Sequence, residues 1–385
     1  MKFSVAKDKL LEGLQTVQNV VSTRTTLPIL SNVLIRAENG ALTLTTNDLD
    51  VGMSCSVEAK IEKPGGTTLP ARRLAGIVKE LAAAEVNVEV DGKNAASIRC
   101  GPSFFKMMGL AEDEFPALPK LETAKGFTLK QKDIKDALRK TAYAISTDET
   151  RYVLNGILFS FKENKLTLVA TDGRRLALVD LEAEFPRSNE VDVVVPAKCV
   201  TELQRLLADD GDLKMSVGEN QIAFEAGGRL LVSKLIEGNY PNYKQVIPQE
   251  SRERVTIERE LLLNAVRRVG LLSSEKSNSV KLNFTKNNLE ITANTPEIGE
   301  ARESLAIAYK SKEFSVAFNP RLSSGSAPQP HGRGNLPRSE RRNEPRRDQD
   351  RHAVPLRADA DAHLVAGHCA AVVIEKSDTG FPTCE

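Results

Sequence analysis

Residues Leu166-Thr-Leu-Val-Ala-Thr-Asp-Gly-Arg-Arg-Leu-Ala-Leu178 are the stretch from which the fold can be worked out. Apolar and polar residues alternate over its first half, which is the period of a half-buried strand. Asp172-Gly173 then predicts a hairpin turn, because glycine accepts a positive φ at no steric cost. Two similar stretches are Leu42-Thr-Leu-Thr-Thr-Asn-Asp-Leu49 and Leu289-Glu-Ile-Thr-Ala-Asn-Thr-Pro296. This recurrence predicts a protein made of three similar parts.

The beginnings of the three parts also align without gaps, at residues 3–14, 127–138 and 255–266. Each begins with a short alternating strand, continues through charged residues and ends in a segment with apolar residues at helical spacing. The starting points lie 124 and 128 residues apart. Periods of that length indicate repeated domains rather than a short-period solenoid.

Each part contains a second strand followed by a helix, marked by a proline. The three segments are Leu69-Pro-Ala-Arg-Arg-Leu74, Val195-Pro-Ala-Lys-Cys-Val200 and Phe318-Asn-Pro-Arg-Leu322. We expect each strand to end in this proline and the second helix to follow, because proline is well tolerated at the first helical turn. We therefore predict an α+β protein of repeated domains. Each domain would consist of two βαβββ-like halves, and each half would pack one amphipathic helix on one face of an antiparallel sheet.

Composition excludes several classes of protein. No run of about 18 apolar residues is present, which argues against a membrane span. The start Met1-Lys-Phe-Ser-Val lacks the apolar core of a signal peptide. The five cysteines are scattered and show no metal-binding spacing, so reduced thiols in the cytoplasm are expected. We predict no metal, no cofactor and no membrane partner.

An enzymatic role has little support from the residues. All four histidines lie between His331 and His368, so residues 1–320 cannot form a nucleophile–histidine–acid set. No glycine-rich phosphate loop appears, and Gly65-Gly66 and Gly227-Gly228 fit turns better. Chemistry by lysine or carboxylate side chains stays open, but we predict that the protein is not an enzyme.

Cations are frequent on the expected helices, although acids are interleaved and the net charge is only +1. Charge alone favours a solvated helix face. If the helices of three similar domains lay on one side, however, their cations would converge and could hold a polyanion. These cations are Lys7, Lys9, Arg72, Arg73, Lys79, Lys130, Lys132, Lys135, Arg139, Lys140, Lys198, Arg205, Arg267 and Arg268.

Several longer motifs make the chain similar to one known family. They are Met1-Lys-Phe3, Arg24-Thr-Thr-Leu-Pro-Ile-Leu-Ser-Asn32, Leu69-Pro-Ala-Arg72, Arg151-Tyr-Val-Leu-Asn-Gly156, Ala170-Thr-Asp-Gly-Arg-Arg-Leu-Ala177 and Tyr240-Pro-Asn-Tyr243. From residue 1 to about 320 the chain resembles the beta subunit of bacterial DNA polymerase III, the beta sliding clamp. The resemblance implies three clamp domains per chain and a head-to-tail homodimeric ring around duplex DNA. That ring would tether the replicative polymerase for processive synthesis, without reading the base sequence.

The resemblance also implies functional residues. Its DNA-contacting positions fall on Arg24, Arg72 and Tyr152, whereas a further one falls on Asp148, an acidic departure. A pocket for the apolar peptides of the polymerase III core, the clamp loader and other clamp-binding proteins is implied between the second and third domains. Its residues are Leu154, Thr171, Gly173, Arg174, Arg175, Leu176, Pro241, Val246 and Asn319. Gln245 and Ser277 depart from the family pattern. Without the resemblance, Leu154, Leu176 and Val246 would be interpreted as core, and Arg175 as the cap of a turn.

The family pattern stops near Arg321. The tail contains nine arginines but one lysine, Lys376, and such a change of composition at one point indicates disorder or foreign sequence. Back-translation in a shifted frame can restore the family's ending, so we predict a frameshift. The expected domains are residues 1–122, 126–250 and 254–320, the last a first half only, followed by an aberrant, disordered tail over 321–385.

Physical consequences follow if the second half of the last domain is missing. Ring closure in the family joins the first domain of one chain to the third of the next, so we expect weak dimerisation and low stability of residues 254–320. Two alternatives stay open. The tail could be a natural basic segment that binds nucleic acid, and the three repeats could form a DNA- or protein-binding module without a ring.

Overall fold

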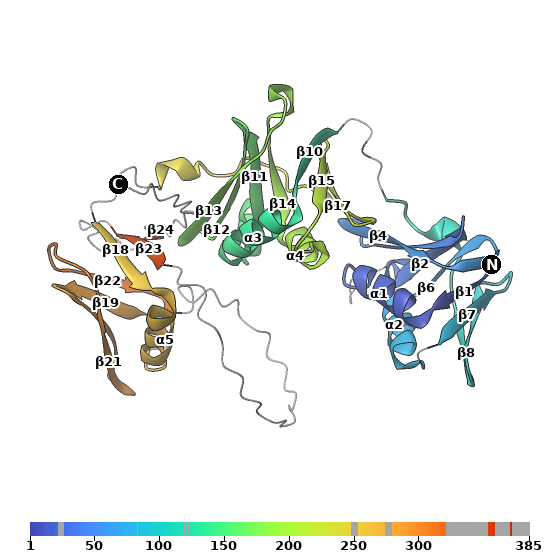
Figure 1. Cartoon of the computed structure of the whole chain (residues 1–385), viewed down its shortest axis with the longest axis horizontal. Helices are drawn as coiled ribbons and strands as arrows, with labels where there is room; N and C mark the ends of the chain where they lie inside the picture. The colour runs from blue at the N-terminus through green and yellow to red at the C-terminus, as the bar shows by residue number, and fades with distance from the viewer. Residues whose placement is uncertain are drawn as a thin grey trace, which may run out of the picture. The chain divides into compact units, whose positions relative to one another are not determined.

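The computed structural model describes residues 1–21, 27–82, 84–118, 121, 124–247, 253–273, 279–320, 353–358 and 370–371. Contacts divide the chain into two compact units. One comprises Met1–Val169 with Asp180–Tyr240, and the other comprises Ala170–Val179 with Pro241–Glu385. The first unit therefore holds the first two repeats almost completely, and the second holds the third repeat with one hairpin of the second (Figure 1).

In the residues that the structure describes, the first repeat contains two α-helices and nine strands. In chain order its elements are β1 (Lys2–Ala6), α1 (Lys7–Val17), β2 (Asn32–Glu38), β3 (Ala41–Asn47), β4 (Val51–Glu58), β5 (Lys60–Lys63), β6 (Gly65–Pro70), α2 (Ala71–Glu80), β7 (Glu85–Val90), β8 (Ala95–Cys100) and β9 (Ser103–Met108). α1 buries Leu10, Leu14 and Val17, three positions that share one helical face. The helical spacing in the sequence is thus confirmed.

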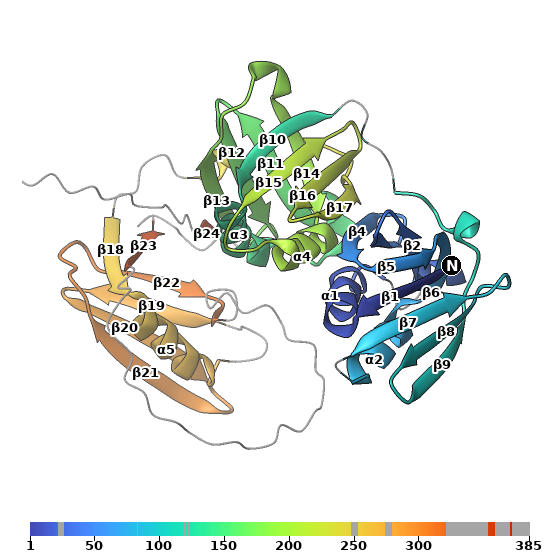
Figure 2. The same cartoon turned by 45° about the vertical axis from the view of Figure 1, so that its right-hand side comes forward.

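The second repeat follows the same order. Its elements are β10 (Lys125–Lys130), α3 (Gln131–Thr141), β11 (Gly156–Lys162), β12 (Lys165–Thr171), β13 (Arg175–Glu182), β14 (Val191–Pro196), α4 (Ala197–Leu206), β15 (Asp212–Val217), β16 (Gln221–Ala226) and β17 (Arg229–Lys234). The strand–turn–strand prediction for residues 166–178 is confirmed by β12 and β13. Figure 2 shows α3 and α4 side by side against the strands of this repeat.

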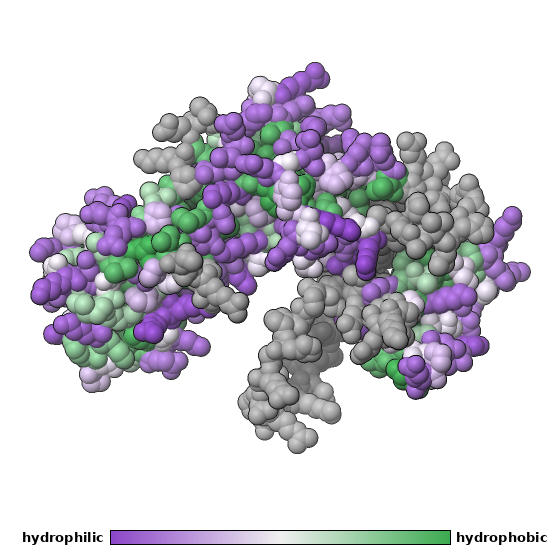
Figure 3. All heavy atoms as spheres, turned by 180° about the vertical axis from the view of Figure 1, so that it is seen from behind, coloured by the Kyte–Doolittle hydropathy of each residue, from purple (hydrophilic) through white to green (hydrophobic). Residues whose placement is uncertain are grey.

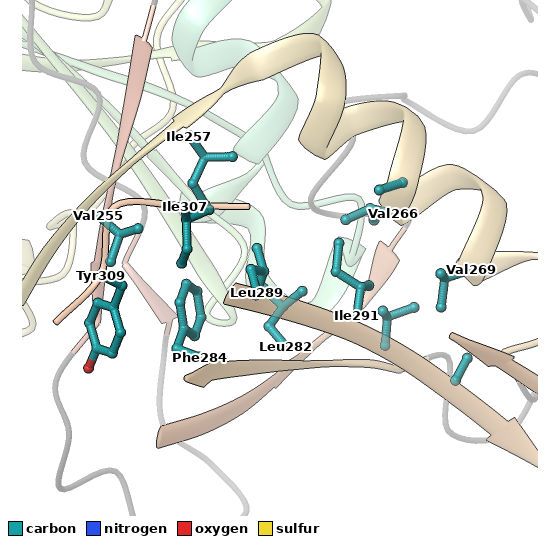
Figure 4. Close-up of a cluster of buried hydrophobic side chains, with 13 residues drawn as sticks. Val255, Ile257, Val266, Val269, Leu282, Phe284, Leu289, Ile291, Ile307 and Tyr309 are labelled. Atoms are coloured by element: carbon teal, nitrogen blue, oxygen red, sulfur yellow. The ribbon is translucent and has the colours of Figure 1, made fainter. Parts of the chain in front are cut away.

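The described part of the third repeat corresponds to the first half of the others. It contains β18 (Glu253–Glu258), α5 (Arg259–Gly270), β19 (Val280–Thr285), β20 (Asn288–Thr295), β21 (Gly299–Ala306) and β22 (Phe314–Phe318). Its core includes Val255, Ile257, Val266, Phe284 and Ile291, contributed by β18, α5, β19 and β20 (Figure 4). Phe284 also stacks on Phe314 with ring centroids 4.4 Å apart. The half-domain therefore has a core of its own.

The antiparallel sheets with helices packed on them confirm the predicted fold class, but the two halves of a domain do not keep separate sheets. β1 lies in the sheet β5-β1-β7-β8-β9 of the second half, and β6 lies beside β2 of the first half. The same exchange recurs when β10 pairs with β15 and β14 pairs with β11. Sequence periodicity identifies strands but not their partners, so this exchange of strands between the halves was not predicted from the sequence.

The first two repeats share a continuous sheet. β17 pairs antiparallel with β4 from Arg229–Cys55 to Ser233–Val51, which gives the eight-stranded order β10-β15-β16-β17-β4-β3-β2-β6. Across this joint, Arg229 Nη2 lies 2.7 Å from Glu12 Oε1 on α1. Edge-to-edge pairing of backbones therefore connects the two repeats, and it also covers two strand edges that would otherwise be open.

In the first two repeats, the proline that precedes the second helix is the last residue of its strand. Pro70 and Pro196 are the last residues of β6 and β14 and cap the helices that begin at Ala71 and Ala197. Their φ values of −55° and −60° suit proline, while their extended ψ values continue the strand. The prediction of a strand that ends in proline and is followed by the second helix is therefore confirmed in the first two repeats.

Two segments of the tail are described, and both are strands. β23 (Ala353–Ala358) pairs antiparallel with β18, and β24 (Ala370–Ala371) pairs parallel with β13 at Arg175 and Leu176. The predicted disorder therefore does not apply to these segments. The rest of residues 321–385 lies outside the described residues, where that expectation stays a prediction.

Hydrophilic side chains cover much of the surface drawn in Figure 3, with smaller apolar areas between them. Within the described ranges, no helix has both the length and the apolar character needed to cross a membrane. The same ranges contain no cluster of three or more His, Cys, Asp or Glu residues that could hold a metal ion.

Candidate functional sites

The turn between β12 and β13 is held by the side chains of Thr171 and Asp172. Asp172 Oδ1 accepts hydrogen bonds from the backbone N–H groups of Arg174 at 2.9 Å and Arg175 at 3.0 Å. Thr171 Oγ1 donates to the Arg175 carbonyl at 2.7 Å and accepts from Gly173 N at 3.1 Å. Gly173 has φ +82°, which explains why glycine occupies this position. The sequence therefore encodes a rigid turn.

The two adjacent arginines of this hairpin differ in their surroundings. Arg175 Nε lies 3.1 Å from Asp172 Oδ2, and both side chains are 19% exposed. Arg174 is exposed at the tip, while Leu176 is buried. The alternative that Arg175 stabilises a turn is thus confirmed as one of its roles. Arg174 is the arginine of this pair that the turn presents to solvent.

The other residues of the predicted peptide pocket fall in both units. Leu154 is buried in the first unit, at the end of the 3₁₀ segment Glu149–Leu154. Pro241, Val246 and Asn319 belong to the second unit, as does the hairpin. Burial of Leu154 and Leu176 agrees with a role in the core, whereas Val246 is 45% exposed and does not. A shared pocket stays a prediction, and Ser277 lies outside the described residues.

Arg72 contacts the backbone of Val21 in the first repeat. Arg72, at the start of α2, donates from Nη2 to the carbonyl oxygen of Val21 at 3.1 Å. Lys198, at the start of α4, donates from Nζ to the adjacent carbonyl of Val20 at 2.9 Å. Arg24 itself lies outside the described residues, in the segment 22–26 that follows Val21. Two cations from two repeats therefore bind the neighbouring carbonyls of Val20 and Val21.

Tyr152 is 59% exposed and lies in the 3₁₀ segment Glu149–Leu154. Asp148 caps this segment through its Oδ1, which accepts from Thr150 N at 3.0 Å and from Thr150 Oγ1 at 2.6 Å. The hydrogen bond from the Thr150 side chain has the largest effect and lowers the pKa of Asp148 below its usual range. The hydrogen bond from the Thr150 backbone N–H and the charge of Arg151 act in the same direction. The acidic departure at Asp148 therefore positions the turn that carries Tyr152.

Many of the helix cations are paired with acids of their own unit. Lys135 Nζ lies 2.6 Å from Asp209 and Lys130 Nζ lies 2.6 Å from Asp212, while Arg268 pairs with Glu303. These pairs are largely exposed and contribute little to stability. For these paired cations, the ion pairs support the interpretation that they belong to a solvated, charge-balanced helix face. Fewer of the helix cations are therefore candidates for contact with DNA.

Sequence reasoning missed Asp48. Its carboxylate forms an ion pair with Lys198 and is the first repeat's counterpart of Asp172. The signal was present in the sequence, because Asn47-Asp48 lies in the stretch that resembles the hairpin of residues 166–178. What the sequence could not provide is the partner, which lies 150 residues away in the next repeat.

Comparisons with known proteins agree with this architecture. The DNA polymerase III beta subunit family matches through its N-terminal domain at residues 1–119, its central domain at 128–242 and its C-terminal domain at 244–322. The beta sliding clamp of Escherichia coli (strain K12) is 37% identical over 325 residues, covering 83% of this chain and 87% of that protein. The Bacillus subtilis (strain 168) beta sliding clamp is 35% identical over 333 residues, with 83% and 88% covered.

Solved structures give the same result. The DNA polymerase sliding clamp from Bacillus subtilis superposes with a TM-score of 0.81 at 34% identity, covering 84% of this chain and 89% of that one. The sliding clamp from Bartonella birtlesii bound to griselimycin superposes with a TM-score of 0.80 at 38% identity, with the same coverage. None of these relatives is named as an enzyme. With all three domain matches in order and these identities, the chain belongs to the DNA polymerase III beta subunit family, the beta sliding clamps.

Proposed function

We propose that this chain acts in the bacterial cytoplasm as a sliding clamp on duplex DNA and holds a replicative polymerase on its template. The observation that carries the proposal is the match, in order, to all three domains of the clamp family. The eight-stranded sheet across the first two repeats supports it, because a clamp needs successive domains joined into one continuous wall. The protein itself would carry out no reaction.

Retention by such a clamp would be topological rather than chemical. A closed ring needs only weak, sequence-independent attraction to the phosphate backbone, since strong pairing would slow sliding. The balance of 53 basic and 52 acidic residues and the paired helix cations fit this requirement. In the family the ring is a homodimer. The C-terminal match ends at residue 322, so we expect this chain to dimerise weakly.

The test compares nicked circular plasmid with the same plasmid after linearisation. A clamp loader and ATP are added, and DNA-bound protein is separated by gel filtration. A clamp stays on the circle and is lost through the ends of the linear form. Equal retention on both would instead support a DNA-binding module without a ring. Light scattering after size exclusion measures dimerisation separately, and a stable dimer at low micromolar concentration would contradict the expected weakness.

For DNA contact, Arg24, Arg72 and Tyr152 are proposed to touch the duplex. Arg72 already donates to Val21, but a guanidinium has five N–H donors and can bind a phosphate as well. Replacing Arg24 or Arg72 by alanine should reduce the slope of log affinity against log salt by about 1 for each lost phosphate contact. Lys60→Ala, at an exposed strand residue, is the control and should leave the slope unchanged. An unchanged slope in Arg24→Ala would remove that residue from the interface.

For partner binding, the hairpin Thr171–Leu176 together with Leu154, Pro241, Val246 and Asn319 is proposed to receive a short apolar peptide. The rigid turn supports this, because a preformed surface loses little conformational freedom on binding. A labelled apolar clamp-binding peptide, measured by fluorescence anisotropy, tests the site. Griselimycin is bound in two related clamps and should compete with that peptide. Failure of griselimycin to displace a bound peptide would place the peptide elsewhere.

A further inference from the structure

The first strand of each clamp repeat needs a partner from beyond the second helix. β1 pairs antiparallel with β7 from Lys2–Glu89 to Ala6–Glu85, and β10 pairs antiparallel with β15 from Lys125–Val217 to Lys130–Asp212. Both partners are the strands that directly follow α2 and α4. The equivalent position beside β18 would belong to a second half that the family match does not reach in this chain.

A strand of the tail occupies that position. β23 pairs with β18 in an unbroken antiparallel register of six residues, from Glu253–Ala358 to Glu258–Ala353. Its direction and length equal those of the β10–β15 pair. We propose that residues 353–358 are an internal replacement strand that completes the edge of the third repeat, although the surrounding sequence has no family resemblance. The occupant is this segment of the same chain.

The register supports the proposal because it aligns apolar residues. Val255 and Ile257 of β18 belong to the buried core of the third repeat, beside Ile307 and Tyr309 (Figure 4). The register sets Leu356 opposite Val255 and Val354 opposite Ile257. Directly opposite residues of an antiparallel pair lie on the same face of a sheet. The register therefore places Val354 and Leu356, the two apolar residues that flank Pro355, opposite the two core residues of β18.

Pro355 also fits this position. It stands opposite Thr256, and proline has no backbone N–H to donate. We therefore assign Thr256–Pro355 to the pairs that are not hydrogen-bonded, in which the N–H of each residue points away from its partner and the missing donor costs β18 nothing. On the outer edge, the same proline would discourage the addition of a further strand. The flanking pairs Val255–Leu356 and Ile257–Val354 would then be the hydrogen-bonded ones.

A disulfide trap tests the pairing. Arg254 and Arg357 are opposite each other in a pair of the same class as Thr256–Pro355, for which Cα atoms lie about 4.5 Å apart. That separation permits a disulfide. The full chain carries Arg254→Cys and Arg357→Cys, with Cys369 and Cys384 replaced by serine. Arg254→Cys with Ala353→Cys is the control, because residue 353 is four positions out of register, about 13 Å along the strand.

Mild oxidation followed by non-reducing electrophoresis and peptide mapping gives the result. A crosslink within one chain for the in-register pair, at least tenfold more abundant than for the control, is expected. A crosslink between two chains would show that the strand comes from a second copy, and that result would overturn the proposal. Equal yields for both pairs, or no crosslink, would overturn it as well.

Hydrogen exchange provides a measurement that needs no disulfide. The amides of Val255 and Ile257 should exchange at least tenfold faster in Leu356→Asp than in the parent chain, because the variant places a charge opposite Val255. Arg357→Asp changes the neighbouring residue, whose register position is on the other face, and should leave the exchange of both amides unchanged. Equal exchange in the parent and in Leu356→Asp would contradict the pairing.

Discussion

Asp48 and Asp172 occupy equivalent turns in two repeats, and their carboxylates bind different cations. Asp48 Oδ1 accepts from Val51 N at 2.8 Å, as Asp172 Oδ1 accepts from Arg175 N at 3.0 Å. Asp172 pairs with Arg175 of its own hairpin, whereas Asp48 pairs with Lys198 of the next repeat. The same aspartate-capped turn thus stabilises a candidate binding hairpin in the second repeat and a contact between repeats in the first.

Lys198→Met should weaken the junction between the first two repeats. It removes the ion pair with Asp48 and leaves the carbonyl of the buried residue Val20 without this donor. We expect the free energy of unfolding to fall by about 1–2 kcal/mol in urea denaturation. Lys79→Met, at an exposed lysine of α2, is the control. Equal urea midpoints for the two variants would show that the contacts of Lys198 with Asp48 and Val20 contribute nothing to stability.

The two arginines of the hairpin should separate stability from binding. Arg175→Ala removes a half-buried ion pair and should lower the free energy of unfolding by about 1 kcal/mol. Arg174→Ala, at an exposed position, should leave stability unchanged but weaken the proposed peptide binding severalfold. Denaturation and anisotropy are measured on both variants. Stronger destabilisation by Arg174→Ala than by Arg175→Ala would contradict these assignments.

Gly156→Ala should destabilise the second repeat through a backbone collision. A Cβ at this position would lie 2.4 Å from the carbonyl oxygen of Val195 on the paired strand β14. Because backbone cannot move aside cheaply, we expect a loss of about 1–3 kcal/mol in thermal or chemical unfolding. Gly126→Ala, where no atom lies within 4 Å of the new Cβ, is the matched strand control. Parent-like stability of Gly156→Ala would refute the argument.

The carboxyl group of Glu202 should lower the free energy of unfolding as pH rises, which is the opposite of the usual effect of a carboxyl group. Burial raises the pKa of Glu202, and Arg205 and Lys198 offset only part of this effect. A carboxyl with a raised pKa binds its proton more tightly in the folded state, so its contribution is greatest at low pH and is lost as pH rises through the folded value.

Glu202→Gln should therefore be equal to or more stable than the parent near neutral pH, by less than about 1 kcal/mol, since it also loses the pair with Arg205. The difference should shrink as pH falls toward the ordinary glutamate pKa of 4.5. Glu219→Gln, at an exposed turn, is the control for urea midpoints measured across this range. A stability advantage of the variant that grows on acidification would reverse the assignment.

The buried cysteines Cys55 and Cys199 should resist thiol reagents until the protein unfolds. Burial raises the pKa of Cys199 to about 12 and that of Cys55 to about 11, and the reactive species is the thiolate. Maleimide labelling with peptide mapping should modify Cys55 and Cys199 at least tenfold faster in 6 M urea than in buffer. Comparable rates in the two conditions would indicate that these strands and helices open readily.

The sequence predicted the elements of the chain better than their pairing. Alternation and helical spacing located strands such as β12 and helices such as α3, because these periods arise from local geometry. The exchange of first strands between halves was not predictable, since a pattern of period two is satisfied equally by any partner. For the candidate sites, the sequence located the Thr171–Arg175 turn and the Arg72 helix start, but not the contact of Lys198 with Val20 and Asp48.

By itself, the sequence determined the threefold repeat, the turn chemistry of Asp172-Gly173 and the point near Arg321 where the family pattern ends. These depend on residues close together in the chain, whose spacing reports directly on backbone conformation. Only the tertiary structure decided that Asp48 pairs with Lys198, that β4 continues into β17, and that residues 353–358 lie beside β18. Those choices depend on which distant surfaces meet, and no local pattern records that.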